Sequence, residues 1–320
     1  PERAIGLHDS QERNVQVSRM ADELWGDVDG KQVTSRRVGK GLLIQGVPLD
    51  KALKLAEIQP DFTYVNADGS SVDNSPSSGD LPPVNFLHRR SEETDFYFVA
   101  NYTQQTQCLI GRFHVTGMAP QRWDPLTGQV EKLAAWRYVD GATELPLSLG
   151  PGGSAFIVFQ PIEQPDPVVS LKHGDKELFP PKGNAPGFCD WRLTVDDQGR
   201  LCLHTGIEGT FTATTAGGNH FTTQAPVKPD PIKVSGPWKV DFESGLGAPA
   251  TALFPSLISW SEHSDEGVRY FSGHANYHTD FTVPSSLLSA GRKIWLDLGQ
   301  VEVAASLKVN GKDQIGRAHV

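Results

Sequence analysis

Three pairs of neighbouring carboxylates are the first candidates for acid and base chemistry in this sequence. The pairs are Glu92-Glu93, Asp196-Asp197 and Asp265-Glu266. A hydrolytic acid and base must converge on one bond, whereas neighbouring residues on a strand point to opposite faces. Each pair also lies among turn-forming residues. We therefore expect solvated loop carboxylates, and we assign no catalytic residue in this sequence.

The run His88-Arg89-Arg90 is a second candidate for ligand chemistry. It follows a stretch with helical periodicity and begins a stretch of alternating strands, and clefts commonly form where domains meet. An arginine guanidinium can hold hydroxyl groups, or it can orient a carboxylate through two parallel hydrogen bonds. The same side chains can instead form salt bridges that anchor two domains. This anchoring interpretation is favoured.

Exposed aromatic side chains are candidates for stacking against a ligand ring. The candidates are Trp123, Trp136, Trp238, Trp260, Tyr270 and Tyr277. Such residues more often pack in a core or between domains. Trp260 is the best candidate for an exposed platform, because serines flank it on both sides. His274 and His278 share one face of a predicted strand without the spacing of a helical zinc motif, so we expect no metal site there.

Composition argues against two classes of partner. The chain has 320 residues, a net charge of −9 and no stripe of lysine and arginine, so nucleic acid is not an expected partner. It has no run of about 20 apolar residues that would insert into a membrane. The three cysteines are Cys108, Cys189 and Cys202, and none forms a CxxC pair. We expect free thiols, with a Cys189–Cys202 pair across a hairpin as the alternative.

Helical signals dominate the first 84 residues. Val17, Met20 and Leu24 recur at helical spacing before Gly26. Residues 38–45 are a candidate strand, and Pro48 opens a second predicted helix. Helix, strand and helix in this order indicate the end of an α/β domain. A loop or linker rich in Ser, Asp, Gly and Pro follows.

Short antiparallel strands are predicted for the rest of the chain. Six strands lie between residues 86 and 160, and Phe96, Phe98 and Ala100 share one face of the second. Proline-rich stretches at 160–167 and 226–231 separate groups of strands. We therefore predict a mainly β protein with two antiparallel β-sandwich domains. The end of an α/β domain occupies residues 1–84, a β-sandwich occupies 85–231, and a truncated jelly roll occupies 232–320.

A hairpin signal lies near the end of the chain. Val303, Leu307 and Val309 alternate on one face, and Asn310-Gly311 follows, a pair that favours a tight β-turn. A returning strand is expected next. Residues 314–320 (QIGRAHV) can instead be reverse-translated into a sequence that matches a common sequencing-library adapter. We interpret them as an artefact, and we expect both ends of the chain to be cut.

Several short motifs follow one another in a distinctive order. They are MADELWG at 20–26, LHRR at 87–90, DFYFVAN at 95–101, WDPLTG at 123–128, LGPGGSAF at 149–156, YFSGHANY at 270–277, LDLG at 296–299 and VNG at 309–311. Their order resembles that of the bacterial family 106 glycoside hydrolases, the α-L-rhamnosidase family. The resemblance covers most of residues 21–312 and is weakest at 66–83 and 174–231.

This resemblance implies an enzyme that hydrolyses terminal α-L-rhamnosides of plant or microbial polysaccharides with inversion, using paired carboxylates and a calcium ion. In that family the catalytic barrel lies N-terminal to the matched region. The acid and base are therefore implied to lie outside this chain, which would pack against that missing domain. No cofactor is expected in this part. The resemblance also implies a galactose-binding-like final sandwich, a rhamnose-containing glycan as partner and a periplasmic or extracellular location.

The residues selected as contacts to carbohydrate are His88, Arg89, Arg90 and Trp260. Two other functions remain open. The chain can be a non-catalytic carbohydrate-binding module, or the C-terminal region of another β-galactosidase-like glycosidase. The upstream coding sequence distinguishes them, because a barrel with inward glutamates supports the rhamnosidase and a bare linker supports the binding module.

Overall fold

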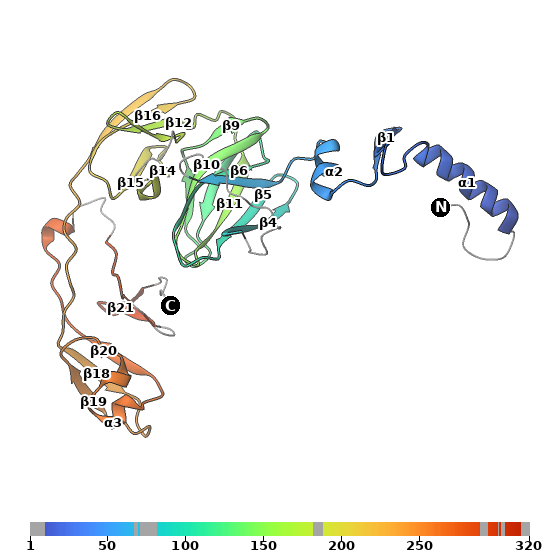
Figure 1. Cartoon of the computed structure of the whole chain (residues 1–320). Coiled ribbons are helices and arrows are strands. Elements are labelled where there is room, and N and C mark those ends of the chain that lie inside the picture. The colour runs from blue at the N-terminus through green and yellow to red at the C-terminus, as the bar shows by residue number, and fades with distance from the viewer. Residues whose placement is uncertain are drawn as a thin grey trace. The chain divides into compact units, whose positions relative to one another are not determined.

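A computed structural model describes residues 10–66, 70, 82–181, 188–288, 294–299, 301 and 305–314 (Figure 1). The described residues form mainly antiparallel β-sheets, so the predicted mainly β fold class is confirmed. The chain divides into two compact units. The first comprises Pro1–Thr205 and Thr210–Thr223, and the second comprises Gly206–Gly209 and Gln224–Val320. The domain boundaries expected after residues 84 and 231 stay predictions.

Two helices lie in the first segment, as the sequence predicts. Helix α1 covers Ser10–Trp25 and is followed by Gly26, whose φ of +55° lies in the left-handed region that favours glycine. Helix α2 covers Leu49–Leu55 and begins directly after Pro48. The expected strand at 38–45 is wrong in its extent. Strands β1 (Ser35–Val38) and β2 (Gly41–Ile44) form a hairpin there, because the chain reverses at Gly39 (φ +59°).

A β-sandwich of two sheets forms the centre of the first unit (Figure 1). One sheet has the strand order β3-β6-β10-β9, and the other has the order β15-β14-β8-β7-β11-β5-β4. The strands are β3 Phe62–Asn66, β4 Val84–Arg90, β5 Asp95–Asn101, β6 Gln107–Phe113, β7 Met118–Trp123, β8 Val130–Leu133, β9 Arg137–Val139, β10 Ala142–Leu149, β11 Ser154–Pro161, β14 Trp191–Val195 and β15 Leu201–Thr205. Strand β3, which precedes the predicted sandwich, pairs with β6 along its whole length.

The core of the sandwich is built from the inward residues of both sheets. Phe96 and Phe98 share one face of β5, as predicted, and are half-exposed there, whereas Tyr97 and Val99 are buried on the other face. Tyr97 packs edge-on against Phe113 of the opposite sheet, with ring centroids 4.9 Å apart. This shared aromatic and aliphatic core holds the two sheets face to face.

Another four-stranded sheet, most of which belongs to the first unit, has the order β13-β12-β16-β17. Its strands are β12 Val168–His173, β13 Lys176–Phe179, β16 Gly209–Thr215 and β17 His220–Ala225.

A disulfide joins two distant segments of the first unit. Before β14, the short 3-10 helix η2 (Phe188–Asp190) contains Cys189, which forms a disulfide with Cys108 of β6. The predictions of three free thiols and of a Cys189–Cys202 pair are therefore both wrong. The partners are 81 residues apart in sequence, and sequence spacing alone does not reveal that their Cα atoms come within 5.5 Å.

The second unit contains a three-stranded sheet in the order β19-β18-β20. Its elements are β18 Trp238–Phe242, β19 Thr251–Phe254, η3 Trp260–Glu262, α3 Glu266–Arg269, β20 Ala275–His278 and η4 Ser285–Leu287. The predicted final hairpin is confirmed: β21 (Leu307–Val309) pairs with β22 (Lys312–Gln314) around Asn310 and Gly311, both with positive φ. The described segment 294–299, which contains the LDLG motif, has no strand. Of the adapter-like peptide, residues 315–320 lie outside the described residues.

Candidate functional site

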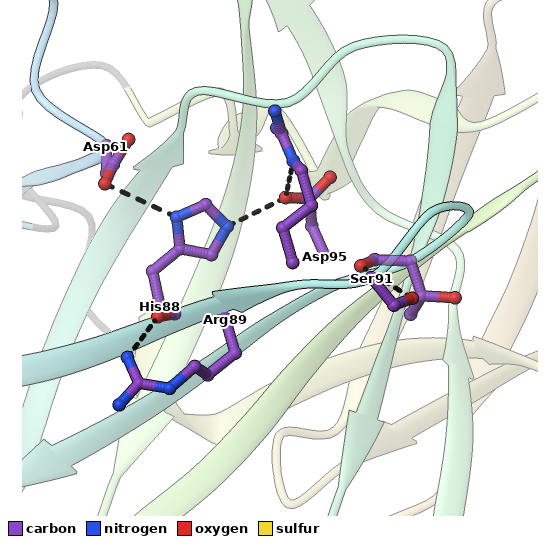
Figure 2. Close-up of polar contacts among 7 residues, drawn as sticks. Asp61, His88, Arg89, Ser91 and Asp95 are labelled. Carbon is purple, nitrogen blue, oxygen red and sulfur yellow. Dashed lines mark hydrogen bonds and ion pairs between the residues drawn. The ribbon is translucent and has the colours of Figure 1, made fainter.

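The predicted contact residues His88, Arg89 and Arg90 lie on β4, at the edge of the seven-stranded sheet. Because successive side chains of a strand point to opposite faces, the run is divided. The His88 ring lies on the side of the strand where Asp61 and Asp95 gather, and Arg89 extends from the other side (Figure 2). The three residues therefore cannot converge on one ligand.

On the inner side, the His88 ring lies between two carboxylates (Figure 2). Its Nε2 atom is 2.7 Å from Asp95 Oδ1, and its Nδ1 atom is 3.4 Å from Asp61 Oδ2. The ring stacks on Tyr97 with centroids 4.1 Å apart and planes inclined by 7°. Asp61 directly precedes β3 of the opposite sheet, so the contact between His88 and Asp61 links the two sheets. While these contacts persist, neither ring nitrogen is available as a general base.

Asp95 is the buried centre of this cluster. It is 2% exposed, and it receives a hydrogen bond of 2.6 Å from Nε of Arg90 in addition to the His88 contact. The hydrogen bond and the charge of Asp95 raise the pKa of Arg90. A buried carboxylate must be paired to be tolerated. We name Asp61, His88, Arg90 and Asp95 the anchor cluster; its contacts join the two sheets of the sandwich.

The Tyr97 hydroxyl lies buried beside the anchor cluster. It has no hydrogen-bond partner among the residues that the structure describes. Burial, followed by the charges of Asp61 and Asp95, raises the pKa of Tyr97, so this side chain stays neutral. Sequence reasoning did not select Asp61, Asp95 or Tyr97. The available signal was the alternation of β5, which places Asp95 and Tyr97 on its buried face.

The opposite face of the same sheet is aromatic. We name the residues that form it the aromatic face: Leu87, Arg89, Phe96, Phe98, Trp123 and Phe156. Leu87, Phe98, Phe156 and Trp123 are direct neighbours across four successive strands, and Arg89 pairs with Phe96 beside them. Ring centroids are 5.0 Å apart for Phe98 and Phe156 and 6.2 Å apart for Phe96 and Trp123. The four rings are half-buried, and Arg89 is exposed.

Two amide side chains lie next to these rings. The Trp123 indole donates a hydrogen bond of 2.9 Å to Oε1 of Gln121, whose Nε2 donates one of 2.8 Å to Oε1 of Gln160. A hollow of about 200 Å³ adjoins one of these rings, that of Phe98. Its lining residues are Asn85, Phe86, Leu87, Phe98, Ala100 and Tyr102. The surface thus combines flat apolar rings with uncharged hydrogen-bonding groups, a combination suited to a ring-shaped polar ligand.

Trp260, the fourth predicted contact residue, belongs to the second unit and is not a freely exposed platform. Its ring is half-buried against Phe242 and Phe271, at centroid distances of 6.0 and 5.4 Å. Its indole N–H donates to the hydroxyl of Tyr277. These contacts make Trp260 part of the small core around β18.

Two of the three pairs of neighbouring carboxylates lie at turns, as the sequence predicts, whereas Asp265-Glu266 lies at the start of α3. Glu92 and Glu93 are exposed between β4 and β5, Asp196 closes a turn with Arg200, and Asp265 caps α3 by accepting a hydrogen bond from Val268. Within the described ranges, no group of three or more histidine, cysteine or acidic side chains is placed to hold a metal ion. The calcium ion that the resemblance implies therefore has no such group of ligands within those ranges.

Comparison with known proteins relates this chain to glycoside hydrolases. Residues 1–138 match the glycoside hydrolase family 106, described as alpha-L-rhamnosidase. The solved structure of the rhamnosidase from Novosphingobium sp. PP1Y is similar over 95% of this chain, with 28% identity and a TM-score of 0.63. This chain corresponds to 22% of that protein.

A second relative comes from Formosa agariphila and is provisionally named a beta-glucuronidase. It is 22% identical over 98% of this chain, which covers 39% of its length. The chain thus spans less than half the length of either relative. By sequence and by fold, this chain is a relative of the family 106 glycoside hydrolases, the α-L-rhamnosidases, as its ordered motifs predict.

Proposed function

We propose that this chain is the C-terminal, supporting part of a glycoside hydrolase that removes terminal α-L-rhamnose residues from plant or microbial polysaccharides. The observation that carries the proposal is the similarity to the Novosphingobium rhamnosidase over 95% of the chain. In this proposal the sandwich supports a catalytic domain that lies outside the chain, and the second unit is a galactose-binding-like module. The positions of the neighbouring carboxylates at turns and at the start of α3 support a location of the acid and base elsewhere.

A glycosidase of different specificity is the second candidate. The name of the Formosa agariphila relative favours it, because that protein is described as acting on a β-glucuronide. The two candidates share a carbohydrate substrate and differ in the sugar that is released. A non-catalytic binding module is the third possibility, and hydrolytic activity of the longer protein excludes it.

The test compares the 320-residue chain with a polypeptide extended by the adjoining coding sequence. We expect the extended protein to hydrolyse an aryl α-L-rhamnoside and the 320-residue chain to be inactive. Preferential hydrolysis of an aryl β-D-glucuronide would support the second candidate. Turnover by the chain alone, abolished by changing one carboxylate within it, would contradict the proposed supporting role.

The proposed location is the periplasm or the outside of a bacterial cell. The Cys108–Cys189 disulfide supports this location, because disulfides persist in oxidising compartments and are rare in the cytosol. Fractionation of cells that express the extended protein tests the proposal. Recovery of the protein from the cytosol with both cysteines reduced would contradict it.

A further inference from the structure

We propose that the aromatic face binds the glycan directly. The identity of the sugar rests on the proposed function. The location of the binding surface is inferred from the geometry of β4, β5, β11 and β7. On this sheet the row Leu87, Phe98, Phe156 and Trp123 crosses four adjacent strands. At about 4.8 Å per strand step, the row extends over about 14 Å, longer than one sugar ring.

The chemistry of the face favours carbohydrate over a purely apolar partner. Gln121 uses one of its two amide donors on Gln160, and the carbonyl of Gln160 rather than its amino group takes part in that bond. An apolar cover would leave the remaining donors without partners at a cost in free energy. Sugar hydroxyls both donate and accept, so a glycan can satisfy these amides while its C–H face packs on the rings.

The position of Arg89 adds a cation to the edge of the same face. Its guanidinium donates to the His88 carbonyl at 3.0 Å, and no carboxylate among the described residues pairs with it. It therefore remains able to donate further hydrogen bonds to hydroxyl groups. Of the three predicted contact residues on β4, Arg89 lies on the aromatic side of the strand. His88 and Arg90 instead contact Asp95 on the other side.

Rhamnose suits this surface because it is a 6-deoxy sugar. Its methyl group replaces the hydroxymethyl group of L-mannose, the matched sugar here, and the hollow beside Leu87, Phe98 and Ala100 is lined mainly by carbon. Burial of a methyl group there is favourable, whereas burial of an unpaired hydroxyl is not. We therefore expect the face to prefer rhamnose oligosaccharides to the matched L-mannose oligosaccharides.

Calorimetric titration of the 320-residue chain with an α-L-rhamnose oligosaccharide tests this site. We expect saturable binding that is weaker for the L-mannose oligosaccharide and at least about tenfold weaker in the Trp123→Ala variant. Tyr270→Ala, which removes an aromatic ring that is 76% exposed in the second unit, is the matched control and should bind normally. Arg89→Ala changes only an exposed side chain, and it should weaken binding even if Trp123→Ala fails to fold.

Unchanged binding in both Trp123→Ala and Arg89→Ala would overturn the site, as would an equal loss in Tyr270→Ala. The proposed function fails separately. If the extended protein hydrolyses no rhamnoside but the chain still binds the oligosaccharide through Trp123, the proposed rhamnosidase function is refuted. The proposed binding surface is then still supported. Hydrolysis by the extended protein with no glycan binding by the chain refutes this surface alone.

Discussion

Arg89 and Arg90 are adjacent in sequence and both exposed, but their side chains extend to opposite sides of β4. Arg90 holds the buried carboxylate of Asp95, whereas Arg89 lies on the other side of β4. We expect Arg90→Ala to lower the free energy of unfolding by about 1 kcal/mol, because it removes one charge-assisted partner of the buried Asp95, while His88 remains and solvent screens the exposed guanidinium. The matched Arg89→Ala should change it by less than about 0.5 kcal/mol. Urea unfolding of both variants measures the difference; equal effects would contradict the anchor cluster.

Two core tyrosines provide a second matched pair. The Tyr64 hydroxyl accepts a hydrogen bond of 3.3 Å from the backbone N–H of Val84, whereas the Tyr97 hydroxyl is buried without a partner among the described residues. Tyr97→Phe removes an unpaired polar group, so it should raise the free energy of unfolding by up to about 1 kcal/mol. Tyr64→Phe leaves Val84 unpaired and should lower it by about 1–2 kcal/mol. Thermal melting distinguishes the two, and stabilisation by Tyr64→Phe would contradict these assignments.

Alkaline pH should act on the same tyrosine. Burial raises the pKa of Tyr97 above the value of about 10 that it has in the unfolded chain. The stability contributed by the neutral phenol is therefore fully present below about pH 10 and is lost as the pH rises above it. Tyr97→Phe should make the melting temperature less sensitive between about pH 9.5 and 11. An unchanged pH dependence would show that Tyr97 ionises normally in the folded protein.

At the scale of elements, the disulfide joins β6 to the segment before β14. Closing a loop of this length restricts the unfolded chain and stabilises the folded one by about 4–5 kcal/mol in the chain-entropy description. We expect Cys108→Ser and Cys189→Ser each to lower the melting temperature markedly, and the double variant to match either single one. Cys202, which is not part of the disulfide, is the control, and Cys202→Ser should have little effect. A thiol assay should find one free thiol in the native protein; three would contradict the pairing.

Local patterns predicted the elements that depend on neighbours in sequence. The spacing before Gly26 predicted α1, alternation predicted the two faces of β5, and Asn310-Gly311 predicted the final hairpin. The errors concern contacts between distant segments. Neither the partner of Cys108 nor the pairing of β3 with β6 leaves a signal in the local sequence.

The candidate site could be predicted only in part, because its residues come from strands that are distant in sequence. The run at 88–90 was selected as a candidate contact to carbohydrate or a salt-bridged anchor, and its division between two faces of the strand required the strand register. Phe156, Trp123 and Gln121 come from strands that meet only in the folded sheet. Trp260 was selected because serines flank it. Those neighbours do not indicate that its ring packs against Phe242 and Phe271.

At the scale of the whole molecule, the two units differ in the amount of core they bury. Among the described residues, the sandwich core contains sixteen buried side chains, whereas the core around β18 contains five. The second unit also exposes large apolar side chains, including Trp295 at 86% and Leu253 at 69%. Because burial of apolar area provides most of the stability of a domain, the second unit should be much less stable than the first.

We therefore expect the chain to unfold in two steps. Calorimetry should resolve an early transition of the second unit and a later transition of the sandwich, since independent units do not share one cooperative transition. Hydrogen exchange followed by mass spectrometry should show amides of β18 and β20 exchanging at temperatures at which β5 and β11 remain protected. Trp238→Ala, at the edge of the small core, should shift only the first transition, whereas Ile157→Ala should shift the second. One transition that both substitutions shift equally would show that the units unfold together, and that the small core is stabilised by more than its own buried side chains.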